Sequence, residues 1–238
     1  MRIKNIIVIS HERSGTHFLI NSIAYNFPKY SNNELSIESG NPEFIQKRLE
    51  GVETDRILKS HHTSEYFGDS LDDFHKFYIV RDGRDVLASC YHHYRQWKLQ
   101  GTFSHFIKHP KLPDHIAEYY CRPFYTSHRS MPHKWVDHVK SWQGRDCWLV
   151  KYEDLTTDFN SVIRQISEKL KLLMPDKIIK PTLKNRSVQP RKGIKGDWKN
   201  YFDSECLAFF NKYAAKIMKE LEYDNGKDDS TRVRRAAN

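Results

Sequence analysis

Four short apolar runs, each no longer than a single strand, constrain the fold of this chain more than any other feature. They lie at residues 4–10, 56–59, 77–80 and 147–150, and their apolar residues are nearly continuous instead of alternating with polar ones. Such strands are typical of parallel sheets, in which helices cover both faces. The runs therefore predict the strands of a buried parallel sheet.

Helical patterns fall between and after these runs. We expect helices at residues 16–25, 85–98, 134–143, 160–172 and 204–221, the last with apolar residues at helical spacing. Alternating strands and helices predict an α/β fold with a mostly parallel central sheet. Residues 101–131 are rich in Pro, His and Tyr and interrupt the pattern, so we expect a lid or an insertion on the substrate side.

Length and composition place these elements in one domain. A chain of 238 residues suffices for one α/β domain, expected at residues 1–223, and the polar residues 224–238 are predicted to be a disordered tail. No apolar run approaches the length of a membrane span and no signal-peptide core follows the N-terminus, so we expect a cytoplasmic protein without a membrane partner. The four cysteines lie far apart without metal-ligand spacing, so neither disulfides nor a metal site is expected.

The formal charge of +9 predicts anionic partners. Charge alone does not distinguish a nucleic acid from a small phosphorylated ligand. Three segments that combine cations with glycine or hydroxyl groups indicate which kind of anionic ligand is expected.

The first of these segments, HERSGTHFL at residues 11–19, follows the first predicted strand. Gly15 allows a tight turn, and Ser14 and Thr16 offer hydroxyl groups where a helix begins, a place that favours phosphate. The loop is not a Walker motif, because it has one glycine and carries Arg13 before it instead of a lysine after it. Ser14 or Thr16 acting only as a helix N-cap would explain the same spacing without a ligand.

The second segment, YIVRDGRDVLASCYHHY at residues 78–94, continues the third predicted strand into a helix. Arg81 at the strand end and Ser89 on the helix are able to hold one phosphate together. The alternative is an Arg81 that merely pairs with Asp82 or Asp85, a partner that Arg84 could also take.

The third segment, RKGIKGDWKNYF at residues 191–202, places two cations beside flexible backbone. Arg191 can donate two hydrogen bonds to phosphate oxygens, Lys192 adds a point charge, and Gly193 lets backbone N–H groups approach an anion. A basic surface turn that binds nothing is the alternative for this segment taken alone.

Together with LVKYEDL at residues 149–155, these segments resemble the sulfotransferases that use 3′-phosphoadenosine 5′-phosphosulfate (PAPS). ERSGTHFL is similar to that family's 5′-phosphosulfate loop, usually written PKSGTTWL, and residues 78–94 resemble its 3′-phosphate strand and helix. Residues 149–155 resemble its central strand and turn, and residues 191–199 its RKGxxGDWK signature. The resemblance extends from Ile6 to about Leu221 and implies a P-loop-like three-layer sandwich with a central parallel sheet flanked by helices.

The resemblance implies a nucleotide site made of the matching positions. The residues expected to wrap the 5′-phosphosulfate are Arg13, Ser14, Gly15, Thr16 and His17. Those expected on the 3′-phosphate are Arg81, Ser89, Arg191, Lys192 and Gly193. Phe18 stands where the family has a tryptophan that stacks on adenine, and Tyr152 matches a tyrosine near the base. Gly196, Asp197 and Trp198 are expected to shape and anchor their segment instead of touching ligand.

The resemblance also implies the catalytic residues. The family carries a Lys-Thr-His segment after its second strand, and the equivalent here is Lys59, Ser60 and His61. His61 is the predicted general base, with the adjacent His62 as the alternative. The family's loop lysine is Arg13 here, and an arginine does not readily give up a proton, so we expect an electrostatic role for Arg13 and an ammonium role for Lys59.

The predicted reaction moves a sulfuryl group from PAPS to a hydroxyl or an amine of a small-molecule acceptor, and leaves adenosine 3′,5′-bisphosphate without help from a metal. The expected acceptor loops at residues 31–46, 65–74 and 101–131 carry many polar groups, which favour a polar or hydroxylated metabolite over a steroid. No nucleic-acid partner is expected, and the oligomeric state is left open. The alternatives are a nucleotide- or nucleic-acid-binding protein without transfer activity, and a P-loop kinase, whose lysine after the loop glycine is missing.

Overall fold

The structure, a computed structural model, describes residues 4–37, 41–96, 99–109, 129–182 and 193–223. Within these ranges the order is β1 (Ile6–Ile9), α1 (Thr16–Asn26), β2 (Ser31–Ile37), α2 (Pro42–Glu50), β3 (Arg56–Ser60), η1 (Ser64–Tyr66), β4 (His75–Val80), α3 (Gly83–Gln96), α4 (Phe103–Lys108), α7 (Met131–Trp142), β5 (Trp148–Lys151), α8 (Tyr152–Thr157), α9 (Phe159–Leu170), η3 (Asp197–Asn200) and α10 (Ser204–Glu220). The predicted tail at residues 224–238 lies outside them, as does most of the predicted insertion.

The described strands form one parallel sheet in the order β2-β3-β1-β4-β5. The four predicted strands are confirmed as β1, β3, β4 and β5. The prediction of an acceptor loop at residues 31–46 is wrong for most of that range, because Ser31–Ile37 forms β2 and α2 begins at Pro42. Among the described strands, this one, SNNELSI, pairs with β3 alone at the edge of the sheet, so it does not need the continuous apolar sequence of an inner strand.

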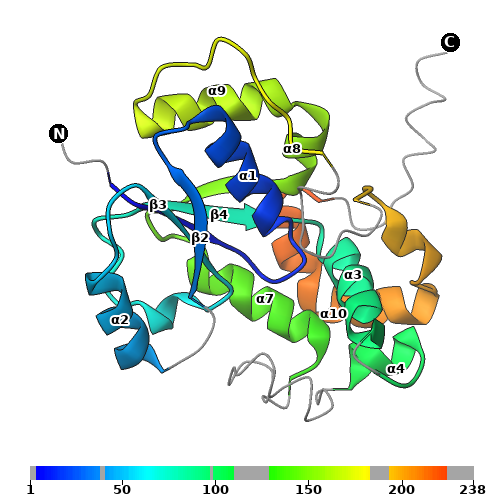
Figure 1. The fold of residues 1–238 in the computed structure, drawn as a ribbon. Coiled ribbons are helices and arrows are strands. Elements are labelled where there is room, and N and C mark those ends of the chain that lie inside the picture. Colours follow the sequence, from blue (N-terminus) through cyan, green and yellow to red (C-terminus); the bar gives the residue numbers. More distant parts are fainter. Residues whose placement is uncertain (1–3, 38–40, 97–98, 110–128, 183–192, 224–238) are drawn as a thin grey trace, which may run out of the picture.

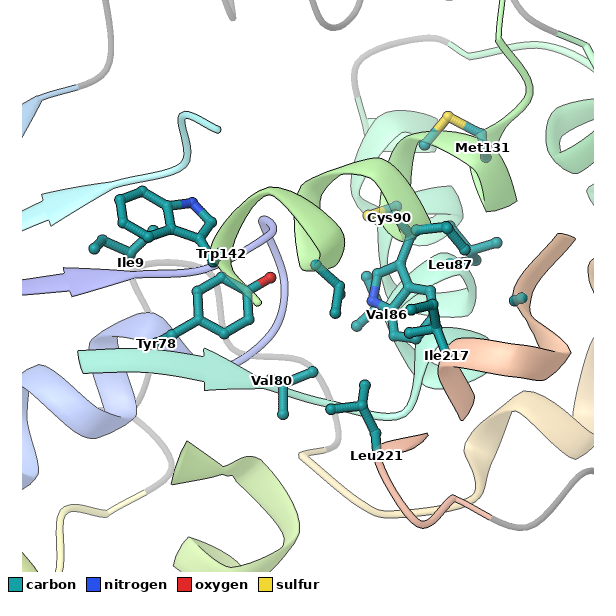
Figure 2. Packing of buried hydrophobic residues seen from close by; sticks show 14 of the residues in the cluster. Ile9, Tyr78, Val80, Val86, Leu87, Cys90, Met131, Trp142, Ile217 and Leu221 are labelled. Atoms are coloured by element: carbon teal, nitrogen blue, oxygen red, sulfur yellow. The ribbon is translucent and has the colours of Figure 1, made fainter. Parts of the chain in front are cut away.

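Alternate strand residues enter two separate apolar clusters. Ile7 and Ile9 of β1 pack with residues of α3, α7 and α10, whereas Ile6 and Val8 pack with residues of α1 and α9. Figure 1 shows α1, α8 and α9 on one side of the sheet and α7 and α10 on the other. In Figure 2 the side chains of Tyr78 and Val80 extend from β4 toward this second layer. The expected three-layer α/β sandwich is confirmed.

The strand order determines where a ligand site would lie. Because all pairs are parallel, the carboxyl ends of the strands share one edge of the sheet. The chain leaves the central strand β1 toward β2 and β3 on one side, and later adds β4 and β5 on the other. The loop after β1 therefore lies where the strand order reverses, which is the usual position of ligands in parallel α/β sheets.

Several helix limits differ from the predicted ones for local reasons. Helix α3 begins at Gly83, before the predicted residue 85, and α9 ends at Leu170 because Lys171 has a left-handed backbone with φ of 54°. Within the predicted insertion, Thr102 caps α4 by accepting a hydrogen bond from the His105 backbone N–H. No helix in the described ranges is both long and apolar enough to cross a membrane.

Candidate functional site

The loop between β1 and α1 turns sharply at two left-handed residues, Arg13 with φ of 64° and Gly15 with φ of 100°. Gly15 is the N-cap of α1, and in the described part of the chain no side chain caps the first turn. The Thr16 hydroxyl instead lies 2.7 Å from the Ser10 hydroxyl. The alternative that Ser14 or Thr16 serves only as an N-cap is therefore wrong, because neither hydroxyl caps the helix. The positive end of the helix dipole faces the loop.

Close packing against Tyr152 requires the glycine of this loop. A Cβ atom added to Gly15 would lie 2.4 Å from Cδ2 of Tyr152, the first residue of α8. The Tyr152 hydroxyl donates to the Gly193 carbonyl over 3.1 Å. The tyrosine therefore joins the first and third segments that the sequence singled out.

Arg81 lies buried at the end of β4, among these residues. Its guanidinium lies 4.6 Å from the centre of the Tyr152 ring, donates to the Ile194 carbonyl over 2.9 Å and lies 3.6 Å from the Asp85 carboxylate. Its Nε atom has no hydrogen-bond partner among the described residues. A buried cation with such a donor suits an anionic ligand.

Both arginines of the RDGRD sequence pair with aspartates. Arg81 lies beside Asp85, and Arg84 donates to Asp82 over 2.6 Å while it covers the Trp198 ring at 4.2 Å. Arg84 binds Asp82 through Nε and Nη2, whereas its Nη1 atom, like Nε of Arg81, has no hydrogen-bond partner among the described residues. Each arginine therefore combines an ion pair with one unused donor.

The segment at residues 193–198, which we call the C-terminal segment, is anchored by Asp85. The two carboxylate oxygens accept hydrogen bonds from the backbone N–H groups of Gly196 at 2.8 Å and Trp198 at 2.9 Å. Burial raises the pKa of Asp85, and the Arg81 charge and these two donors oppose that rise. The expected anchoring role of Gly196 and Trp198 is confirmed, whereas Arg191 and Lys192 lie outside the described residues.

Arg13 links the two expected phosphate positions. Its Nε atom donates to the Ser89 hydroxyl over 3.2 Å, so a residue of the β1–α1 loop contacts a residue of α3 directly. His17 is half-buried in the first turn of α1, and Ser14 is buried. The structure therefore brings Arg13, Ser89 and the start of α1 together, as the sequence predicted that one ligand would require.

Phe18 lies in the core. Its ring is fully buried, stacked at 6.0 Å on Phe159 and edge-on at 6.0 Å to Tyr152. The α1 face that carries it packs on the sheet, so the ring has no exposed face for adenine. The predicted adenine contact of Phe18 has no support in this placement and stays a prediction.

His61 is the first residue beyond β3 and lies beside the β1–α1 loop. Its Nδ1 atom is 2.8 Å from the Ser10 carbonyl oxygen and 3.2 Å from the Ser10 hydroxyl. His62 is instead buried and stacked at 4.5 Å on Tyr66. Lys59 is half-buried on β3, in register with Val8.

The sequence motifs did not indicate a buried pair of opposite charges that lies beside the β1–α1 loop. Glu12 and Lys134 of α7 are both buried, and the Tyr94 hydroxyl donates to the Glu12 carboxylate. Burial lowers the pKa of Lys134 to about 8, and the Glu12 charge opposes that shift. The sequence did contain a sign of this pair, because Glu12 stands where PKSGTTWL has proline.

Among the described residues, no group of three or more His, Cys, Asp or Glu is arranged to hold a metal ion.

The chain matches known proteins along most of its length. The model of the sulfotransferase domain matches residues 4–222. Sulfotransferase 2A1 of Homo sapiens is 25% identical over 260 residues, covering 93% of this chain and 86% of that protein. Sulfotransferase 2B1 of Mus musculus is 23% identical over 282 residues, covering 97% and 77%.

Solved structures share the fold. Retinol dehydratase in complex with androsterone and the inactive cofactor PAP has a TM-score of 0.65 at 18% identity, covering 92% of this chain and 82% of that one. Mouse sulfotransferase SULT7A1 complexed with PAP has a TM-score of 0.61 at 20% identity, covering 100% and 90%. The match of the family model over residues 4–222, on a fold that these structures share, shows that the chain belongs to the sulfotransferase family.

Proposed function

We propose that this chain transfers a sulfuryl group from PAPS to a hydroxyl or an amine of a small-molecule acceptor and releases adenosine 3′,5′-bisphosphate (PAP). The observation that carries the proposal is the position of His61, hydrogen-bonded to Ser10 at the base of the loop that also carries Arg13. Family membership and the PAP named for two proteins of the same fold support the choice of donor.

The residues of the site suit a ligand with two anionic groups. Arg81 offers a buried cation whose Nε has no partner among the described residues, and α1 offers a first turn without a capping side chain. Arg13 and Ser89 lie between these two positions. Arg191 and Lys192 directly precede Gly193 in the sequence, and we propose that they close over the same phosphate as Arg81.

The hydrogen bond of His61 determines which nitrogen can act as a base. A carbonyl oxygen only accepts, so the 2.8 Å contact with the Ser10 carbonyl places the ring proton on Nδ1. The neutral ring then has its lone pair on Nε2, which would accept the proton of the acceptor hydroxyl. The buried, aromatic-stacked position of His62 supports His61 over its neighbour.

Bound PAPS would supply the sulfuryl group. During transfer, the bond from sulfur to the leaving phosphate oxygen breaks and a bond from sulfur to the acceptor oxygen forms, while the acceptor proton moves to Nε2 of His61. Negative charge grows on the leaving phosphate, and Arg13 and Lys59 would stabilise it as fixed cations. Arg13 keeps its proton throughout.

We also propose a polar or hydroxylated metabolite as the acceptor. Retinol dehydratase, a protein of this fold, forms complexes with retinol and with androsterone, so apolar acceptors are the competing class. The predicted acceptor residues of this chain fall largely at residues 110–128, outside the described residues. Turnover with labelled PAPS and a panel of polar and apolar alcohols, phenols and amines would separate the two classes.

Two measurements test the proposed function. Calorimetry should show that PAP binds far more tightly than ATP, and a preference for ATP would favour the kinase alternative. His61→Ala should lower kcat by about a thousandfold, within the usual range for removal of a general base, with the PAP Kd unchanged within about twofold. His62→Gln is the matched control and should retain kcat. Wild-type turnover in His61→Ala would refute the assignment of the base.

A further inference from the structure

One face of α7 holds the backbone of the segment that carries the proposed base. His138, Ser141 and Trp142 recur at the spacing that places helical side chains on one face. His138 Nε2 lies 3.0 Å from the His61 carbonyl oxygen, and Trp142 Nε1 donates to the His62 carbonyl over 3.0 Å. The Ser64 backbone N–H donates to the Ser141 hydroxyl over 3.2 Å. Three side chains of one helix thus bind three backbone groups of residues 61–64.

His138 is itself held from behind by a residue of the sheet. The Tyr78 hydroxyl lies 2.9 Å from His138 Nδ1, and the two rings stack at 5.7 Å. Both residues are buried. Burial raises the pKa of Tyr78 well above its ordinary value, so the hydroxyl keeps its proton.

The direction of each hydrogen bond follows from its acceptors. The His61 carbonyl can only accept, so His138 Nε2 carries a proton and donates it. Nδ1 of the neutral ring is then an acceptor, and the Tyr78 hydroxyl donates to it. Tyr78 and His138 therefore connect β4 with the backbone of His61 through buried, directed hydrogen bonds.

We propose that His138 is a positioning residue that keeps the His61 ring at the correct distance from the β1–α1 loop, and that Tyr78 fixes the tautomer of His138. This proposal rests on the proposed function. His61 is tied at two points, by its ring to Ser10 and by its carbonyl to His138. Loss of the second tie leaves the ring on a backbone that can shift, and a misplacement of about 1 Å can lower a rate about a hundredfold.

Substitutions at His138 distinguish positioning from packing. A glutamine amide reaches the place of Nε2 and can donate to the His61 carbonyl, whereas asparagine reaches only the place of Nδ1. We expect His138→Ala and His138→Asn to lower kcat about 10- to 100-fold and His138→Gln to stay within about threefold of wild type. The PAP Kd should stay within about twofold in all three. His75→Gln, a half-buried histidine at the other end of β4, is the matched control.

Nuclear magnetic resonance tests the hydrogen bonds without any turnover. In protein labelled with ¹⁵N-histidine, the ring signals missing from His138→Gln identify His138, which should be the neutral tautomer protonated at Nε2. Tyr78→Phe should shift its Nδ1 resonance. The His61 ring signals should move in His138→Ala, return toward wild type in His138→Gln and stay unchanged in His75→Gln.

The kinetic and the NMR measurements distinguish a failure of this proposal from a failure of the proposed function. If the wild type transfers no sulfuryl group, the proposed function fails, and the resonances still decide whether His138 positions His61. An Nδ1-protonated His138, or unmoved His61 signals in His138→Ala, overturns the positioning role. Equal kcat values for the alanine and glutamine variants also overturn it, because a packing role does not need the Nε2 donor.

Discussion

Substitution of Gly15 by alanine tests the close packing at the centre of the site. Two separate costs are expected. The left-handed backbone at φ of 100° disfavours any residue with a Cβ, and the new Cβ would lie 2.4 Å and 2.9 Å from two ring atoms of Tyr152. The tyrosine is buried at the start of α8, so its ring cannot swing away into solvent.

The magnitude follows from these two terms. A left-handed conformation costs an L-residue about 1–2 kcal/mol. An extra methyl group in a tightly packed place costs about 1–3 kcal/mol, because neighbours must leave their preferred rotamers or move backbone. The free energy of unfolding should therefore fall by about 2–5 kcal/mol.

Gly144 provides the control that isolates the steric term. It also has a left-handed backbone, with φ of 71°, but a Cβ there would meet no atom within 4 Å. Gly144→Ala should cost only the backbone term, about 1–2 kcal/mol. In urea denaturation followed by circular dichroism, the two variants should differ by about 1 M in midpoint, given slopes of about 1–3 kcal/mol per M.

Equal midpoints for Gly15→Ala and Gly144→Ala would refute the reasoning, because they would mean that Tyr152 does not press on the loop. Combination with Tyr152→Ala provides a second check. In that background the cost of Gly15→Ala should fall to that of Gly144→Ala, since the steric partner is gone. A cost that stays the same would place the strain elsewhere in the loop.

Three further predictions concern charge, core and anchoring. Between pH 8 and 10.5, the free energy of unfolding of the wild type should rise with pH by up to about 3 kcal/mol relative to that of Lys134→Met. The reason is that the folded chain releases the Lys134 proton at a pKa of about 8, whereas the unfolded chain still binds it. Urea titrations in which the wild type and Lys134→Met show parallel pH profiles would contradict this prediction. Phe18→Ala should destabilise the fold by about 3–5 kcal/mol in the same assay, because the ring is fully buried. A loss of PAP affinity without a loss of stability would instead support contact between the Phe18 ring and adenine. Asp85→Asn should weaken PAP binding about tenfold in calorimetry, because one amide oxygen cannot accept from both backbone donors of the C-terminal segment. An unchanged Kd would mean that this segment does not contribute to PAP binding.

The sequence predicts those parts of the fold that depend on local pattern. Each inner strand contains a short uninterrupted apolar run, and helices follow at regular intervals, so the sandwich could be predicted. Parallel strands place their carboxyl ends at one edge, so the meeting of Arg13 and Ser89 could be anticipated as well. The edge strand β2 could not, because its polar sequence resembles a loop until β3 supplies its hydrogen bonds.

Side-chain contacts between distant elements could not be predicted in the same way. Tyr78 lies in a run that any buried strand might have, and His138 lies on an ordinary amphipathic helix, 60 positions away. Only packing of α7 on the sheet brings their polar atoms together. Phe18 illustrates the converse case, since a motif match suggested a ligand contact and the packing of α1 on the sheet buried the ring.

The C-terminal segment is held by hydrogen bonds to its main chain and by the contact of Arg84 with the Trp198 ring. The hydrogen bonds to it reach the carbonyl oxygens of Gly193 and Ile194 and the N–H groups of Gly196 and Trp198. The side chain of Ile194 is 49% exposed, and Lys195 is also exposed. The exposed side chains at positions 194 and 195 therefore contribute little to the placement of this stretch, whereas Gly193 and Gly196, both with positive φ, would be strained by any residue with a Cβ atom.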